Sequence, residues 1–204
     1  MRHLVVAAAC LLGGTSLVAS ETGSDVVVID NPSVRVFRTS RAPSSAAHPA
    51  AVVVPLRDGA TRKAGEAYWT ADPALGPKDG AAGPFVVVEP KSPASPAPGS
   101  AASKGTKPGE QPSTGLSVKP LFENDRVAVL RARMEVGARE GFHTHARDII
   151  VVHLSGGAVE DTAEGATKVN HWKPGDVEFE GRGTSHSARN AGSAIAVVLV
   201  TLKP

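Results

Sequence analysis

Cysteine, aromatic side chains and net charge are all scarce in this sequence. The one cysteine among 204 residues, Cys10, lies in an N-terminal segment that we expect to be removed, so the mature chain has no disulfide and no reactive thiolate. Any metal must therefore be held by histidine, carboxylate or water. The formal net charge is only +2 and there is no basic cluster that would follow a phosphate backbone, so we predict no nucleic-acid partner.

Long hydrophobic runs are also missing. The N-terminal run Leu4–Leu12 ends far short of the ~20 apolar residues that a membrane-spanning helix needs. Arg2 precedes this run and Val18–Ser20 offers small residues for cleavage, which is typical of a secretory signal. We predict a signal peptide over residues 1–20 and export to the periplasm or the extracellular space. A membrane anchor and lipidation of Cys10 are the alternatives.

What the sequence has in quantity favours β structure. Valine is frequent, glycine and proline number 21 and 16, and the apolar runs are short and bounded by Pro, Gly or Asp. Such runs predict strands, and several in succession predict an all-β barrel or sandwich. The predicted strands are residues 25–29, 33–38, 51–56, 85–89, 126–134, 148–154, 167–172, 176–180 and 194–202.

A segment without large apolar side chains divides these strands into two groups. Residues 91–115 have five prolines and no Val, Ile, Leu, Met or aromatic residue, so they cannot bury enough apolar area to offset the entropy of ordering them. We predict a Pro/Ser/Ala/Gly linker here. It would join an N-terminal lobe of residues 25–90 to a C-terminal lobe of residues 116–204.

The two lobes resemble each other in sequence. Asn31–Arg38 matches Asn124–Arg131 in spacing, and each lobe ends on an apolar run. Val-rich strands can align by chance, which is the alternative explanation. The polar matches at both ends of the two segments favour a duplication.

Three histidines of the C-terminal lobe have the pattern of a metal site. His143 and His145 stand two apart, and residues i and i+2 of a strand project from the same face. His186 follows a Gly-rich turn about forty residues later. Three imidazoles brought together from neighbouring strands can hold one ion and leave positions open for water or substrate.

At these positions the C-terminal lobe resembles the cupins. Their first motif is Gly, five residues, His-x-His, three or four residues, Glu, six residues, Gly; the matching residues are Gly137, His143, His145 and Gly156. Their second motif is Gly, five residues, Pro, x, Gly, two residues, His, three residues, Asn; the matching residues are Gly175, Gly183, His186 and Asn190, with Gly181 in place of the proline. The resemblance implies a double-stranded β-helix, or jelly-roll barrel, and the repeated N-terminal lobe implies a two-lobed, bicupin-type protein.

One position departs from the cupin pattern. Ile149 stands where the family has its glutamate, and Asp148 is one residue out of step, so it would face the other way unless a bulge turned it inward. The resemblance therefore implies a site of three histidines, His143, His145 and His186, for one divalent ion: Fe, Mn, Ni or Zn. A barrel that keeps the fold and merely hydrogen-bonds these rings is the alternative.

The other histidines are weaker candidates. His153 has the parity of Ile149 but lies ~13 Å further along the strand, so we predict a buried, hydrogen-bonded ring outside the metal site. His171 is expected at the surface or at a strand edge. His48 has no second ligand nearby in the sequence, and we predict no metal in the N-terminal lobe.

Charged residues near the histidines allow two interpretations each. Arg139, Glu140 and Arg147 either line the barrel mouth, where they would suit an anionic substrate, or form a solvated rim. Arg131 and Arg133 either grip a carboxylate inside the barrel or have a structural role.

Two functions are compatible with these observations. The first is a mononuclear metal enzyme, an oxygenase or isomerase of a small molecule, whose catalytic residues the sequence does not assign. The second is a non-catalytic binding module or scaffold, with the N-terminal lobe as the interface of a homodimer or as an intramolecular interface. A carboxylate facing the histidines would favour the first, and none can be assigned from the sequence.

Overall fold

The computed structural model describes residues 25–43, 46–48, 50–71, 83–91 and 113–204. The predicted signal peptide and residues 92–112 of the predicted linker lie outside these ranges. All regular secondary structure within them is β, which confirms the predicted all-β class. No helix among the described residues is long and apolar enough to cross a membrane.

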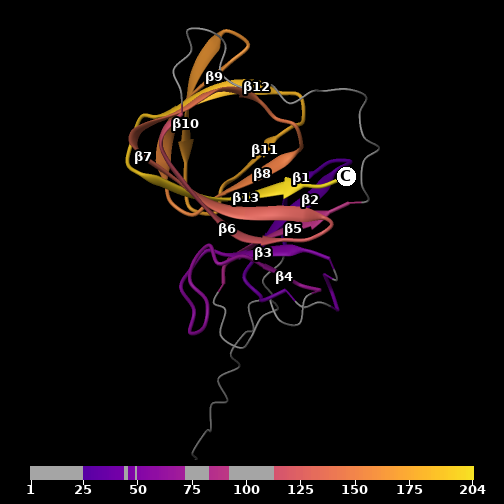
Figure 1. Ribbon diagram of the computed structural model, residues 1–204. Coiled ribbons are helices and arrows are strands. Elements are labelled where there is room, and N and C mark those ends of the chain that lie inside the picture. The colour runs from indigo at the N-terminus through magenta and orange to yellow at the C-terminus, as the bar shows by residue number, and fades with distance from the viewer. Residues whose placement is uncertain (1–24, 44–45, 49, 72–82, 92–112) are drawn as a thin grey trace, which may run out of the picture.

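Eight strands of the C-terminal part form one antiparallel sheet that curls into a barrel (Figure 1). Their bounds are β6 Thr114–Glu123, β7 Val127–Thr144, β8 Ile149–His153, β9 Gly157–Ala163, β10 Ala166–Trp172, β11 Val177–Glu180, β12 Ser185–Asn190 and β13 Ile195–Leu202. The order is β10-β9-β12-β7-β13-β8-β11, with β6 on the free side of β7. Because β7 has 18 residues, its first part pairs with β13 and its last part with β12, so it belongs to both halves of the barrel.

A second, five-stranded sheet precedes the barrel. Its strands are β1 Val26–Asp30, β2 Val34–Thr39, β3 Val52–Pro55, β4 Tyr68–Trp69 and β5 Phe85–Pro90, in the order β1-β2-β5-β3-β4. The barrel has the same order in β6-β7-β13-β8-β11. The turns before β2 and β7 also agree, because Asn31 Oδ1 accepts hydrogen bonds from the N–H groups two and three residues ahead and Asn124 Oδ1 does the same.

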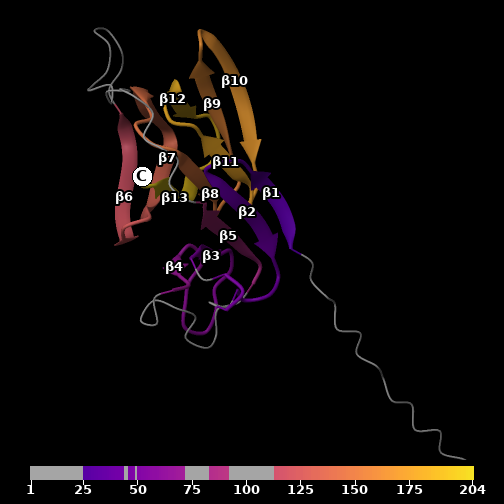
Figure 2. The same ribbon diagram turned by 90° about the vertical axis from the view of Figure 1, so that its right-hand side faces the viewer.

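The two sheets pack face to face and share one hydrophobic core. Figure 2 shows β1, β2 and β5 lying against the barrel strands β8, β11 and β13. The fully buried valines and isoleucine of this core are Val34, Val36, Val52, Val54, Val86, Val88, Val127, Ile150, Val152, Val198 and Val200. Each such side chain contributes roughly 1.5–3 kcal/mol on burial, so the covering sheet is a major source of stability.

The alternation of the barrel strands fixes what faces the interior. Ile150 and Val152 of β8 lie in the core between the sheets, so the intervening Ile149, Val151 and His153 face the inside of the barrel. In β13 and β11, too, alternate residues pack in the core between the sheets and the residues between them face the interior. The interior is thus built from the residues that the inter-sheet core does not use.

The predicted strands are all present, and four strands were not predicted. The missed strands are β4, β6, β9 and β12. β6 begins at Thr114, two residues before the predicted start of the C-terminal lobe. Neither face of β6 is buried over its first seven residues, so the short alternation of Leu116 and Val118 with polar residues faces solvent instead of the core.

Candidate metal centre

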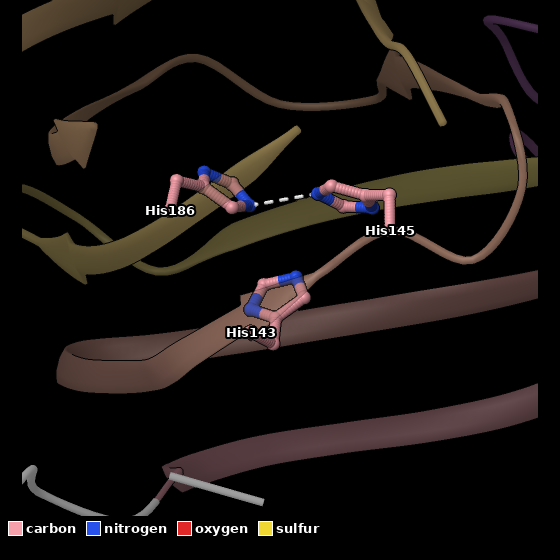
Figure 3. Close-up of side chains that lie close together, drawn as sticks. All are labelled: His143, His145 and His186. Carbon is pink, nitrogen blue, oxygen red and sulfur yellow. Dashed lines mark hydrogen bonds between the residues drawn. The ribbon is translucent and has the colours of Figure 1, made fainter. Parts of the chain in front are cut away.

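The antiparallel pairing of β7 with β12 brings the three histidines together. His143 lies opposite His186 in the ladder, and the N–H of His145 donates to Thr184 O at 2.9 Å just beyond it. The N–H of Gly183 returns a bond to His145 O at 2.8 Å, and its φ of 86° requires a residue without a Cβ. In Figure 3 the three rings point toward a common centre.

The spacing of the rings suits one ion. The ligand nitrogens of His143, His145 and His186 all lie within 4.8 Å of one another, and the Nε2 atoms of His145 and His186 are 3.1 Å apart. Two nitrogens bound at about 2.1 Å to one metal, at an angle of about 90–109°, lie about 3.0–3.4 Å apart. The observed separation falls in that range.

Two of the rings are held by their other nitrogen. The Nδ1–H of His143 donates to Gly141 O at 2.9 Å, and the Nδ1–H of His186 donates to Asp161 Oδ1 at 2.8 Å. Both bonds leave Nε2 as the nitrogen directed at the centre. A carbonyl or carboxylate behind the imidazole is the usual arrangement around a metal-binding histidine, because it fixes the tautomer and the ring orientation.

A carboxylate that sequence reasoning missed faces the histidines. Glu180 of β11 has Oε2 3.7 Å from Nε2 of His145 and Oε1 4.0 Å from Nε2 of His186. It lies directly opposite Ile149 of β8 in the ladder. The barrel therefore has no carboxylate at the family position but has one beside it, on the neighbouring strand.

The signal for Glu180 was present in the alternation of β11. Val177 and Phe179 pack against the core between the sheets, so Glu178 and Glu180 face the interior. Asp148, the substitute considered from the sequence, does not turn inward: its Oδ1 accepts a bond from the N–H of Arg182 at 2.7 Å. Asp148 therefore anchors the Gly-rich turn and is not a ligand.

Burial changes the pKa values of the side chains at this centre. Desolvation, with the nearby His186 and His143, lowers the pKa of His145 to about 4, so this ring is neutral at pH 7 and available as a ligand. Burial raises the pKa of Glu180 to about 7. Burial opposes the charged form of His186, but the hydrogen bond to Asp161 and the charges of Glu180 and Glu140 outweigh it and raise the pKa of His186.

Both sequence motifs lie on the strands that assemble this centre, in an antiparallel sheet that curls on itself. The C-terminal unit is a cupin-type barrel. This confirms the predicted fold class for residues 116–204.

The cupin-type barrel is also similar to solved structures. No protein-family model and no curated protein matches the chain. A cupin domain from Bordetella pertussis is 23% identical, with a TM-score of 0.42 over 49% of this chain and 100% of its own. An RmlC-like cupin from Shewanella frigidimarina is 17% identical, with a TM-score of 0.38 over 50% of this chain and 94% of its own. The polyketide cyclase RemF from Streptomyces resistomycificus is 16% identical, with a TM-score of 0.40 over 47% of this chain and 70% of its own. At these identities the likeness is one of fold and says nothing of ligand or activity.

The predicted rim and interior arginines do not face the centre of the cupin-type barrel. Arg131 Nη1 donates to Ala64 O of the N-terminal part at 3.4 Å, which makes its role structural, and Arg133 is exposed and paired with Glu135. Arg139 and Arg147, the predicted rim arginines, are exposed as well.

Glu140 is the predicted rim residue that comes close to the centre. Its Oε1 lies 3.6 Å from His143 Nε2, and its side chain is 40% exposed. The charged residues nearest the histidines are therefore acidic, which does not suit the anionic substrate considered from the sequence.

The remaining histidines differ from the centre and from one another. His48 Nδ1 lies 2.6 Å from Glu89 Oε1 in the N-terminal sheet. His171 is exposed on the edge strand β10, as predicted. His153 is buried as predicted, but the expectation of a hydrogen-bonded ring was wrong, because neither ring nitrogen has a hydrogen-bond partner.

Proposed function

We propose that this protein is an exported mononuclear metalloprotein that acts on a small molecule, with His143, His145, His186 and Glu180 as the ligands of one divalent ion. The observation that carries the proposal is the inward carboxylate of Glu180 beside three converging imidazoles. Imidazole and carboxylate together suit Fe(II), Mn(II), Ni(II) and Zn(II).

The residues present fit such an ion. The Glu180 side chain is 18% exposed, and no lysine or arginine among the described residues pairs with it. A buried carboxylate without a cation is costly, and a divalent ion would supply the missing positive charge. The same ion would occupy the lone pairs that the His143 and His186 hydrogen bonds direct inward.

The chain's own groups have distinct roles in this proposal. A bound metal would supply Lewis-acid polarisation or, if redox-active, electron transfer. Asp161 and the Gly141 carbonyl orient the rings, and Ile149 forms an apolar wall beside them. Glu140, half exposed near His143, is placed to accept a proton from a substrate at the barrel mouth.

One observation favours a non-catalytic binding module as the second candidate. The Nε2 atoms of His145 and His186 are within hydrogen-bond distance, at 3.1 Å, so these two rings can satisfy each other without a metal if one carries the proton. The barrel would then be a fold retained for ligand binding or as a scaffold.

We further propose that residues 26–90 are a reduced second cupin unit. The shared strand order and the equivalent turns at Asn31 and Asn124 support this proposal. Because this sheet covers the barrel within one chain, the intramolecular interface considered from the sequence is favoured over a homodimer contact.

Elemental analysis of the purified protein separates the two candidate functions. The metalloprotein proposal expects about one divalent ion per chain after aerobic or anaerobic preparation, and His186→Ala should lose it. His171→Ala, which changes an exposed histidine of the same barrel, is the control and should keep the ion. Absence of stoichiometric metal from both preparations of the parent protein would leave the binding module as the better account.

A further inference from the structure

A second polar position inside the barrel is His153, at the opposite end of β8 from Ile149. The residue is 3% exposed, and both Nδ1 and Nε2 lack a hydrogen-bond partner. Its backbone is fully engaged, since its N–H donates to Asp176 O and its carbonyl accepts from the N–H of Gly175. The unsatisfied groups are therefore those of the side chain alone.

An imidazole buried in this way requires an explanation. Leaving a buried polar group without a partner costs roughly 1–3 kcal/mol, and native proteins usually satisfy such groups by water or a ligand. An apolar residue would fill the same space without that cost. The histidine is thus better explained by a hydrogen bond to a molecule other than the protein.

The surroundings of His153 provide two further contacts for such a molecule. The ring stacks on Trp172 with centroids 4.4 Å apart and planes 15° apart. Glu178 Oε2 lies 4.0 Å from Nε2 of His153, too far for a direct hydrogen bond. An oxygen or nitrogen atom about 2.8 Å from each would bridge them.

This position is separate from the metal ligands. His153 is four residues along β8 from Ile149, or ~13 Å, whereas Glu180 lies directly opposite Ile149. Glu178 is opposite Val151, between the two levels, and faces the same interior. A ligand bound at His153 therefore does not need to displace any of the four proposed metal ligands.

The charged side chains around this interior are carboxylates. Three carboxylates approach the interior histidines: Glu178 Oε2 lies 4.0 Å from His153 Nε2, Glu140 Oε1 lies 3.6 Å from His143 Nε2, and Asp161 Oδ1 lies 2.8 Å from His186 Nδ1. Arg131 and Arg133, the cations of the adjoining strand, point away. An anionic group would be repelled here, whereas a neutral donor or a cation would not.

We propose that His153, Glu178 and Trp172 form a second binding subsite inside the barrel, which takes the hydroxyl or amino group of an uncharged or cationic ligand. The proposal deepens the proposed function by naming the substrate class. It rests on that function only for the role of the ligand as substrate. Binding itself does not require a metal.

Three probes with one carbon skeleton test the charge preference: 1,2-propanediol, 1-amino-2-propanol and lactate. Trp69→Phe leaves Trp172 as the only tryptophan, so its fluorescence reports the subsite. We expect the neutral and cationic probes to bind with millimolar dissociation constants and lactate to bind at least tenfold more weakly. Metal content is measured on the same samples, so failure of the metal proposal and failure of this one are distinguishable.

Matched variants identify the residues. His153→Phe keeps a flat ring against Trp172 and should abolish binding of all probes, whereas His171→Phe, an exposed change on the strand of Trp172, should leave it unchanged. Glu178→Gln, which is expected to fold because Glu178 is partly exposed, should weaken the cationic probe about tenfold and the diol little. Equal or tighter binding of lactate, or no response of Trp172 to any probe, would overturn the proposal.

Discussion

At the scale of single residues, the centre depends on a carboxylate displaced by one strand. Ile149 stands in β8 where the cupin motif has its glutamate, and Glu180 supplies a carboxylate from β11 at the same level of the barrel. Asp161 accepts the hydrogen bond of His186 Nδ1 and so fixes the orientation of that ring. Four side chains from three segments thus converge, although the two motifs alone predicted only three ligands.

Asp161 acts through His186, so its loss should weaken the centre without removing a ligand. Asp161→Asn keeps the size but removes the charge that accepts the Nδ1–H bond, and we expect metal affinity to fall about 10–100-fold. Chelator competition measures the affinity. Glu160→Gln, the adjacent acid that pairs with Arg189, should bind metal like the parent; an equal loss in both variants would refute the role of Asp161.

Glu180 should also make the stability of metal-free protein depend on pH. Burial raises its pKa from 4.5 to about 7, so between these values the folded state binds more protons than the unfolded state and stability falls as the pH rises. Glu180→Gln removes this penalty and should raise the free energy of unfolding by roughly 2–3 kcal/mol at about pH 8 and by little at about pH 4.

Urea unfolding in the presence of a chelator measures that difference. His145, whose pKa is lowered to about 4, has the opposite effect, losing stability as the pH falls, but it is present in both proteins and is largely removed by the comparison. A stability difference that does not change between the two pH values would show that Glu180 is ordinarily solvated.

At the scale of the elements, alternation explains what could be predicted. Strands with one face in the inter-sheet core, such as β8 and β13, show regular apolar residues and were found from the sequence. β9 and β12 were missed because they are mostly half buried and consist largely of small or polar residues, so neither strand shows a run of large apolar side chains. Glu180 could not be assigned from the sequence because the cupin motif has its glutamate at the position of Ile149 in β8, and only the ladder shows that β11 lies beside it.

The β8–β11 ladder makes the position of the carboxylate exchangeable. Residues directly opposite in an antiparallel pair have Cβ atoms about 4.5–5.5 Å apart, so moving the carboxylate from Glu180 to Ile149 should keep it within reach of the histidines. We expect Glu180→Ile to lose most of the bound metal and the double variant Ile149→Glu with Glu180→Ile to regain it. Elemental analysis compares the variants; a double variant as metal-poor as the single one would contradict the equivalence of the two positions.

At the scale of the whole molecule, the two sheets share one hydrophobic core, and we therefore expect them to unfold together. The histidine motifs and the fold of the barrel could be read from the sequence, whereas the packing of the sheets could not, because a Val-rich run does not reveal its partner. The shared core joins residues on both sides of the predicted linker. Because of this shared core, the N-terminal sheet stabilises the barrel by direct packing.

Each sheet carries one tryptophan, which allows their unfolding to be followed separately. Trp69 lies in β4 of the N-terminal sheet and Trp172 in β10 of the barrel. In urea, the Trp69→Phe and Trp172→Phe variants, once corrected for their own stabilities by circular dichroism, should show fluorescence transitions that coincide with loss of β structure. A Trp69 transition that precedes loss of the barrel would show that the sheets unfold independently.

Anomalous diffraction from crystals of the purified full chain tests the proposed four-ligand centre most directly. We expect one metal peak about 2.0–2.3 Å from the ligand nitrogens of His143, His145 and His186 and from an oxygen of Glu180, with Asp161 still bonded to Nδ1 of His186. A barrel without such a peak after anaerobic preparation, or a metal held by the histidines with Glu180 turned away, would contradict it.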